Sequence, residues 1–298
     1  MKASIKRTNA FINILLGVSA LSILLILITG GGTFELGGIK VTADVIDNPM
    51  AFMIGLFFLK IFIHPAFEEK MQRSFSRVSG NRRLLYFVFL GFFGLILFLN
   101  LMHFLFPDKT LWDLDSEHGL GTVASVGFLL LTALLCILIF TRESRLKMPG
   151  AKSWIPVMAI FSYLMLDELI AIHEVISSPR FLEKAIQAHP LLAKLEWLNL
   201  YAPFFLAAGA FLAYFMFKKF FRRKNIFLIL VLASLCYFAG LFSEAVMLGG
   251  ELRGTAVYRI QVAGEESLEM LGTVLFMLAF FLYYQILQMN KQQTHQDQ

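Results

Sequence analysis

Residues Gly119–Phe140 read GLGTVASVGFLLLTALLCILIF and contain no charged side chain. A bilayer core of about 30 Å is crossed by about 20 apolar residues in a helix that rises about 1.5 Å per residue. This stretch is therefore long enough to span a membrane. Segments of similar composition recur along the chain and bring the candidate spans to eight: Ala10–Ile28, Met50–Ile63, Leu84–Phe106, Gly119–Phe140, Trp154–Ile172, Leu198–Phe217, Ile226–Leu248 and Val262–Leu287.

The composition of the whole chain agrees with this interpretation. Of its 298 residues, 58% are hydrophobic and 16% are charged, and the mean hydropathy is +0.70. Soluble domains carry about 25% charged residues. We therefore expect an all-α, polytopic helical membrane protein with about eight transmembrane helices, and not a soluble enzyme or a nucleic-acid-binding protein. The two cysteines, Cys136 and Cys236, lie in apolar runs, which excludes a disulfide framework.

Lys and Arg residues are distributed unevenly between the two sides of these spans. With the N-terminus in the cytoplasm, 19 of the 26 Lys and Arg residues fall on the inner side. Because cytoplasmic loops carry an excess of these residues, we expect both termini to be cytoplasmic. The run Lys218–Lys224 and the loop around Arg73–Arg83 are expected to contact anionic inner-leaflet lipid. The small size, the short loops and the charge bias favour a bacterial inner membrane.

The connecting segments predict two accessory features within a single transmembrane domain that covers residues 1–289. In the outer loop 30–49, two β-like runs flank Gly37-Gly38 and predict a small hairpin. The outer segment 177–197 mixes apolar and charged residues as in a helix that lies in the membrane interface, so we expect it to cover the outer ends of the bundle as a lid. Residues 290–298 are polar and are expected to form a disordered tail in the cytoplasm.

The acidic residues show the opposite distribution to the basic ones. Seventeen of the 21 Asp and Glu residues lie in outer loops or in the outer part of the helices. Ionisable residues inside transmembrane segments are costly unless they face the bundle, so they are functional candidates. At 1.5 Å per residue, Asp167 lies about 20 Å from the inner interface, and Glu244 and Glu269 each lie about 27 Å from it. We therefore expect carboxylates and imidazoles of several helices to meet in one pocket near the outer surface.

Angular spacing on the span Trp154–Ile172 places only some of its candidates together. Asp167 and Glu174 are seven residues apart and share a helical face. Glu168 and His173 point about 140° apart on an ideal helix. One of these two must face elsewhere, or the helix must break before His173.

The other acidic groups have spacings that favour a common direction. Glu265, Glu266 and Glu269 span only about 100° of a helix, so their side chains project to one side. Asp115 and His118 have the same i, i+3 spacing as Glu266 and Glu269. They share a face if the helix that contains Gly119–Phe140 begins early.

This concentration of acidic groups predicts a cation. So many carboxylates cannot all remain ionised at low polarity, so some are protonated or a polyvalent cation neutralises them. Carboxylates and one or two His residues on facing helices are the ligands of two-metal sites in helical bundles, and they suit Fe, Mn, Zn or Mg. The candidate metal ligands are His118, His173, Glu244, Glu266 and Glu269. The candidate catalytic acids and bases are Asp167, Glu168, Glu174 and Glu265.

The leading functional hypothesis is a metal-dependent membrane enzyme that acts on a lipid or lipid-linked substrate, which reaches the pocket laterally beneath the lid. Neither the His motifs of membrane desaturases and metalloproteases nor Gly-x-Ser-x-Gly nor a Walker loop is present. A proton- or cation-coupled transporter is the first alternative. Transporters usually bind their substrate and coupling ions near the midplane of the bilayer, whereas the charged residues here lie near one face of the membrane. A membrane scaffold of an envelope assembly, with the acidic rim as its docking surface, is the second.

Overall fold

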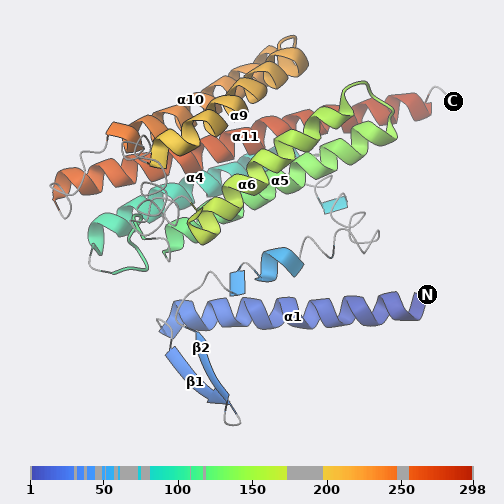
Figure 1. The fold of residues 1–298 in the computed structure, drawn as a ribbon. Coiled ribbons are helices and arrows are strands. Elements are labelled where there is room, and N and C mark those ends of the chain that lie inside the picture. The colour runs from blue at the N-terminus through green and yellow to red at the C-terminus, as the bar shows by residue number, and fades with distance from the viewer. Residues whose placement is uncertain are drawn as a thin grey trace, which may run out of the picture.

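The computed structural model describes residues 2–29, 32–36, 39–43, 49–50, 52–56, 60, 73–74, 81–107, 109–116, 119–172, 197–246 and 255–296. The chain is predominantly helical with one small sheet (Figure 1). Its principal elements are α1 (Lys2–Thr29), β1 (Gly32–Leu36), β2 (Ile39–Ala43), α4 (Arg82–Leu105), α5 (Leu120–Arg145), the 3₁₀ turn η1 (Ala151–Ser153), α6 (Trp154–Ile170), α9 (Trp197–Phe220), α10 (Lys224–Val246) and α11 (Ala256–Gln296).

Six helical segments are long and apolar enough to cross a membrane, which indicates an integral, multi-pass membrane protein. They are Arg83–Leu105, Leu120–Arg145, Ala151–Ile170, Pro203–Phe220, Lys224–Ser243 and Ala256–Met289. These segments coincide with the last six spans predicted from the sequence. The first predicted span falls on α1, where the apolar segment Ala10–Leu24 is shorter than the other six, and the second, Met50–Ile63, is described only in part. Eight spans are therefore not confirmed.

The bundle is organised around α11, which packs against α10 on one side and against α5 and α4 on the other (Figure 1). α5 packs in turn against α6. Most of α5 and α11 is buried, whereas α4 and α9 expose most of their apolar surface. Lipid chains are as apolar as Leu, so such exposed faces are stable in a membrane. The Asn100 side chain of α4 donates a hydrogen bond to Ser267 Oγ of α11 at 2.7 Å and fixes these two helices together.

The predicted hairpin is confirmed. β1 and β2 pair antiparallel beside α1, away from the other labelled helices (Figure 1). Glu35 lies opposite Lys40 in the pairing. The predicted lid, apart from Trp197 at the start of α9, lies outside the described residues.

Charge separates the two ends of the bundle. At the basic end, on the right of Figure 1, α5 ends with Arg142 and Arg145, and α9 turns into α10 through the run Lys218–Lys224. At the acidic end, on the left, lie the segment 109–116 and the acidic residues of α6 and α11. The separation agrees with the uneven charge distribution found in the sequence.

A buried ion pair closes the basic end. Glu143 of α5 is fully buried and accepts hydrogen bonds from Lys219 Nζ of α9 at 2.6 Å and from the Tyr283 hydroxyl of α11 at 2.5 Å. The Lys219 ammonium also lies 5.3 Å from the ring of Trp154 on α6, within the range of a cation–π interaction. Glu143, Lys219, Tyr283 and Trp154, here named the clasp, therefore tie four helices together. Burial of these charges is tolerated because they neutralise each other.

The end of α6 explains the angular conflict noted in the sequence. The helix ends at Ile170, and Ala171 adopts φ 47° and ψ 52° in the left-handed region. The regular helix therefore breaks before His173, which is one of the two solutions expected. An alanine in this conformation is strained, because its β-carbon crowds the following carbonyl group.

α5 begins at Leu120, one residue after the predicted start of this span, and follows an extended Gly119 at φ −86° and ψ 172°. The condition under which Asp115 and His118 would share a helical face, an earlier start of this helix, is therefore not met. α11 continues as far as Gln296, into the segment that we expected to be a disordered tail. Lys and Gln residues, which predominate there, are good helix formers.

Candidate functional site

A large cavity lies in the acidic half of the bundle. Its volume is about 1120 Å³, and its walls come from the segment 109–116 and from α5, α6, α9, α10 and α11. Among the described residues that line it, none is basic. Six are acidic: Asp115, Asp167, Glu168, Glu265, Glu266 and Glu269.

The cavity brings together acidic residues that are far apart in the sequence. Asp167 and Glu168 come from α6, and Glu265, Glu266 and Glu269 come from α11. All five side chains are partly buried. Acidic residues of both helices therefore line the same cavity.

A complete metal-ligand set is not seen. Within the described part of the chain, no group of three or more His, Cys, Asp or Glu side chains is arranged to hold a metal ion. The candidates His118, His173 and Glu174 lie outside the described residues, as does the side chain of Glu244 on α10. Of the expected ligands, the structure therefore places only Glu266 and Glu269 at the cavity.

Away from the carboxylates, the cavity is apolar. Its wall continues along α11 from Glu265 to Phe276, which corresponds to about 16 Å of helix, and along α9 from Phe204 to Met216, which corresponds to about 18 Å. Either length is about half of a bilayer core of about 30 Å. The cavity is thus about one leaflet long, with its acidic groups at one end.

The cavity wall is also part of the outer surface of the bundle. Several residues that line it are exposed on the outer surface of the described chain, among them Leu206, Leu235, Phe238 and Phe242. In a membrane-spanning protein, exposed apolar side chains at this level face lipid. A single layer of helices therefore separates lipid chains from the apolar part of the cavity.

Sequence reasoning missed a hydrogen-bonded chain in the cavity wall. The Thr273 hydroxyl donates to the Glu269 carbonyl oxygen at 3.0 Å, and the hydroxyl oxygens of Tyr237 and Thr273 lie 2.5 Å apart. Since a threonine has a single hydroxyl proton, Tyr237 is the donor to Thr273. The phenol oxygen of Tyr237 therefore has its lone pairs available to the cavity that it lines. Tyr237 lies seven residues before Glu244, and residues seven apart share a face of a helix. This spacing in the sequence could have identified Tyr237 as a candidate.

Two glycines allow α10 and α11 to approach each other at this point. A β-carbon at Gly240 would lie 3.0 Å from Glu269 Cγ, and one at Gly272 would lie 2.7 Å from Tyr237 Cδ2. The absence of side chains at Gly240 and Gly272 thus gives Glu269 and Tyr237 the space that they occupy.

The segment 109–116 is held in place by both neighbouring helices. The Tyr258 hydroxyl of α11 donates to Asp115 Oδ2 at 2.9 Å. The backbone N–H of Leu114 donates to Nδ1 of His103, a buried residue of α4, at 3.2 Å. Asp115 is therefore fixed at the cavity by contacts to other elements and not by a helix of its own.

Comparison with known proteins gives a family and no function. No curated protein and no solved structure matches the chain. One family model, described as a domain of unknown function (DUF8692), matches residues 108–284, which is more than half of the chain. The matched segment contains all the described residues that line the cavity as well as the clasp, and it excludes α1, the hairpin and α4. The chain therefore belongs to the DUF8692 family of domains of unknown function.

Proposed function

We propose that the protein is a membrane enzyme that acts on a lipid or lipid-linked substrate and uses the acidic residues of the cavity together with a divalent or dinuclear metal centre. The observation that carries this proposal is the form of the cavity, which has six acidic residues at one end of an apolar chamber about one leaflet long. Such a chamber suits an amphiphile. Its polar group would lie among the carboxylates while its hydrocarbon chain extends toward the centre of the membrane.

The charge of the cavity supports a cation at its acidic end. Several carboxylates in a medium of low polarity disfavour one another's ionised state, and the described lining contains no basic side chain. A divalent cation would relieve this repulsion and could also polarise a phosphoryl or carbonyl oxygen of the substrate or activate water.

The roles in this proposal follow from position in the chain. Glu266 and Glu269, one turn apart on α11, would hold the metal with Glu244, His118 and His173. His118 follows Ser116, a lining residue, by two positions, and His173 follows the end of α6 by three. Asp167, Glu168, Glu174 and Glu265 would move protons to and from the substrate. Tyr237 joins them as an acceptor of a substrate hydrogen bond.

Metal analysis of the purified protein tests the proposal. After incubation with Mn²⁺, Fe²⁺, Zn²⁺ or Mg²⁺ and gel filtration, we expect stoichiometric metal in the parent protein and a loss of at least tenfold in affinity in the double variant Glu266→Gln/Glu269→Gln. Glu35→Gln, the same chemical change on the hairpin, is the matched control and should retain the metal. Equal metal content in all three proteins, or none in the parent, contradicts the metal-dependent enzyme.

The lipid part of the proposal has its own test. A β-carbon at Gly209, which lines the chamber from α9, would meet no other atom within 4 Å, so a larger side chain there fills the chamber without a clash at its first atom. We expect Gly209→Phe to reduce the lipid that co-purifies with the protein, as measured by mass spectrometry. Gly91→Phe on α4, which also has open space, is the control.

One observation favours a proton- or cation-coupled transporter as the second candidate. Asp167, Glu168, Glu265, Glu266 and Glu269 line one cavity, and carboxylates gathered within a membrane protein can take up and release protons or bind cations. A metal-free protein whose proteoliposomes move protons or cations supports the transporter. If neither metal nor transport is detected, a scaffold role remains.

We further propose that the basic end faces the cytoplasm of a bacterial inner membrane and contacts its anionic lipid. The run Lys218–Lys224 at the turn between α9 and α10 supports this orientation, because cytoplasmic loops are rich in Lys and Arg. A membrane-impermeant thiol reagent applied to intact cells should label a cysteine at Lys109 and not one at Arg222. The reverse labelling pattern contradicts the orientation.

A further inference from the structure

α9 is packed unevenly along its length. Near the basic end, Phe215, Met216 and Phe220 are buried, and the ring of Phe215 lies 5.0 Å from that of Trp154. Toward the acidic end the burial stops, because every residue from Pro203 to Tyr214 is at least partly exposed. One end of α9 is therefore part of the core, and the other is only a wall of the cavity.

The clasp fixes the buried end of α9. The Lys219 ammonium of α9 pairs with the fully buried carboxylate of Glu143, and it also faces the rings of Trp154 and Tyr283 at 5.3 and 5.7 Å. Displacement of this end would separate buried charges and expose them to an apolar medium, which is strongly unfavourable.

The opposite half of α9 has few interlocking contacts. Four of its eight residues that line the cavity are small: Ala208, Gly209, Ala210 and Ala213. A side chain at Gly209 would meet no neighbour within 4 Å. Pro203, inside the helix, cannot donate the backbone hydrogen bond that would otherwise close this turn. Elements with few packed contacts move at low cost in free energy.

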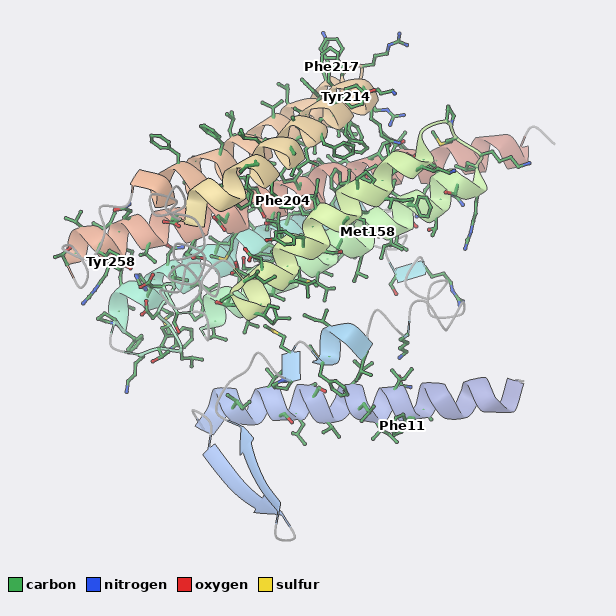
Figure 2. The ribbon with its side chains drawn as sticks, viewed as in Figure 1. Phe11, Met158, Phe204, Tyr214, Phe217 and Tyr258 are labelled. Carbon is green, nitrogen blue, oxygen red and sulfur yellow. The ribbon has the colours of Figure 1, made fainter. Side chains whose placement is uncertain are left out.

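A ring contact closes the gap between this half of α9 and α6. The rings of Tyr163 on α6 and Phe204 on α9 lie 4.8 Å apart, and Phe204 remains 42% exposed. Figure 2 shows Phe204 near α6, whereas Phe217 at the other end of α9 points away from the bundle. On α6, Leu164 lines the cavity immediately after Tyr163, and Asp167 lies one turn further on.

We propose that α9 is a hinged wall of the cavity. The clasp is its fixed end, and its acidic-end half swings away from α6 so that a hydrocarbon chain passes between Tyr163 and Phe204 into the apolar chamber. This inference rests on the lipid substrate proposed above and adds the route by which that substrate arrives. The seam between α6 and α9 is thus the lateral gate of the cavity, and Tyr163 and Phe204 are its gate residues.

Distances between spin labels in lipid nanodiscs test the hinge. In a protein with Cys136→Ala and Cys236→Ala, labels at Ala207→Cys and Leu166→Cys report on the acidic-end half, and labels at Phe217→Cys and Ile155→Cys report on the clasp end. All four label positions are exposed, and none lines the cavity. We expect a broad or two-peaked distribution for the first pair and a single narrow one for the second. Equal widths, or a broader distribution at the clasp end, overturn the hinge.

A cleavable crosslink tests the gate. Tyr163→Cys and Phe204→Cys in the same cysteine-free background are joined by a short bis-thiosulfonate linker, and the protein is exposed to a phospholipid that carries a photoreactive diazirine in its acyl chain. We expect labelling of the largely buried, cavity-lining peptides of α5 and α11 to fall at least fivefold in the crosslinked protein and to recover after reduction. The single variant Tyr163→Cys, treated with the same linker, carries the modification without a crosslink and should leave labelling unchanged.

The outcomes separate the gate from the function on which it rests. Labelling that persists in the crosslinked protein overturns the route between α6 and α9 but leaves a lipid-binding cavity intact. Absence of labelling even before crosslinking overturns the lipid substrate and the gate together, while the spin-label distances still decide whether α9 is hinged.

Discussion

The two ends of the bundle treat acidic side chains in opposite ways. At the basic end, the single carboxylate of Glu143 is enclosed, neutralised by Lys219 and surrounded by aromatic rings. At the acidic end, six carboxylates line one open cavity, and no basic residue lies among its described lining. Both arrangements sit in helices that are otherwise apolar.

The difference indicates that the two ends have different roles. An ionised group that is buried with a complete set of partners contributes to holding helices together, and its loss is costly. Ionisable groups gathered around a large cavity cost stability and are characteristic of sites that bind or transform something. The basic end thus contributes to holding the bundle together, and the acidic end holds the site that we propose.

Breaking the clasp should have the largest effect on stability. Lys219→Met leaves the Glu143 carboxylate buried without its cation, which we expect to lower the free energy of unfolding by about 3–5 kcal/mol. Unfolding in mixed micelles with increasing SDS measures this change. The double variant Lys219→Met/Glu143→Leu should recover most of the loss because it buries no charge. A single variant as stable as the parent protein would show that the clasp is not structural.

Crowding the contact between α10 and α11 should have the next largest effect. In Gly272→Ala the new β-carbon would lie 2.7 Å from Tyr237 Cδ2 and 3.1 Å from the backbone oxygen of Ala233. Overpacking of this kind lowers the free energy of unfolding by about 1–3 kcal/mol. Gly264→Ala on the same helix meets no atom within 4 Å and should instead gain up to about 1 kcal/mol from helix propensity. Equal stability of the two variants contradicts the close approach.

Relief of the strain at the end of α6 should produce a smaller gain. Ala171 has a left-handed backbone at φ 47°, which costs about 1–2 kcal/mol for a residue with a β-carbon. Ala171→Gly removes that cost but raises the conformational entropy of the unfolded chain, so we expect a net gain of about 0.5–1 kcal/mol in the same SDS titration. Ala171→Val should be destabilising. A loss in the glycine variant would mean that the end of α6 is not strained.

The smallest stability change is expected at the acidic end itself. Glu266→Gln removes one of several like charges, so its free energy of unfolding should stay within about 0.5 kcal/mol of the parent protein, in the stabilising direction. Glu143→Gln at the basic end is the matched comparison and should be clearly destabilising. If both substitutions cost the same, the contrast between the two ends is incorrect.

Much of this arrangement could be predicted from the sequence because the thickness of the bilayer fixes the length of a spanning helix, and with it the depth of each residue in the membrane. A count of 1.5 Å per residue placed Asp167 and Glu269 at similar heights, and the structure puts both in one cavity. The alternation of inner and outer loops likewise separated the basic residues from the acidic ones. The hairpin followed from two β-like runs around Gly37-Gly38.

Other features depend on packing that periodicity does not contain. The clasp pairs Glu143 with Lys219 across 76 positions, and nothing local to either residue indicates its partner. Tyr237 and Thr273 lie inside apolar runs and are uncharged, so sequence reasoning, which considered ionisable residues in the spans, did not identify their paired hydroxyl groups. The metal-ligand set stays a prediction, because His118 and His173 lie outside the described residues.

The burial of Trp154 gives the protein an internal optical probe. Its indole ring has 0% exposure and is packed among Phe215, Phe280 and Tyr283. An indole in such a dry environment emits at short wavelength and is shielded from iodide or acrylamide in the surrounding water. In a variant in which Trp112 and Trp197, the other two tryptophans, are replaced by phenylalanine, a red shift of this emission therefore reports solvent reaching the helix junction beside Lys219, without any added dye.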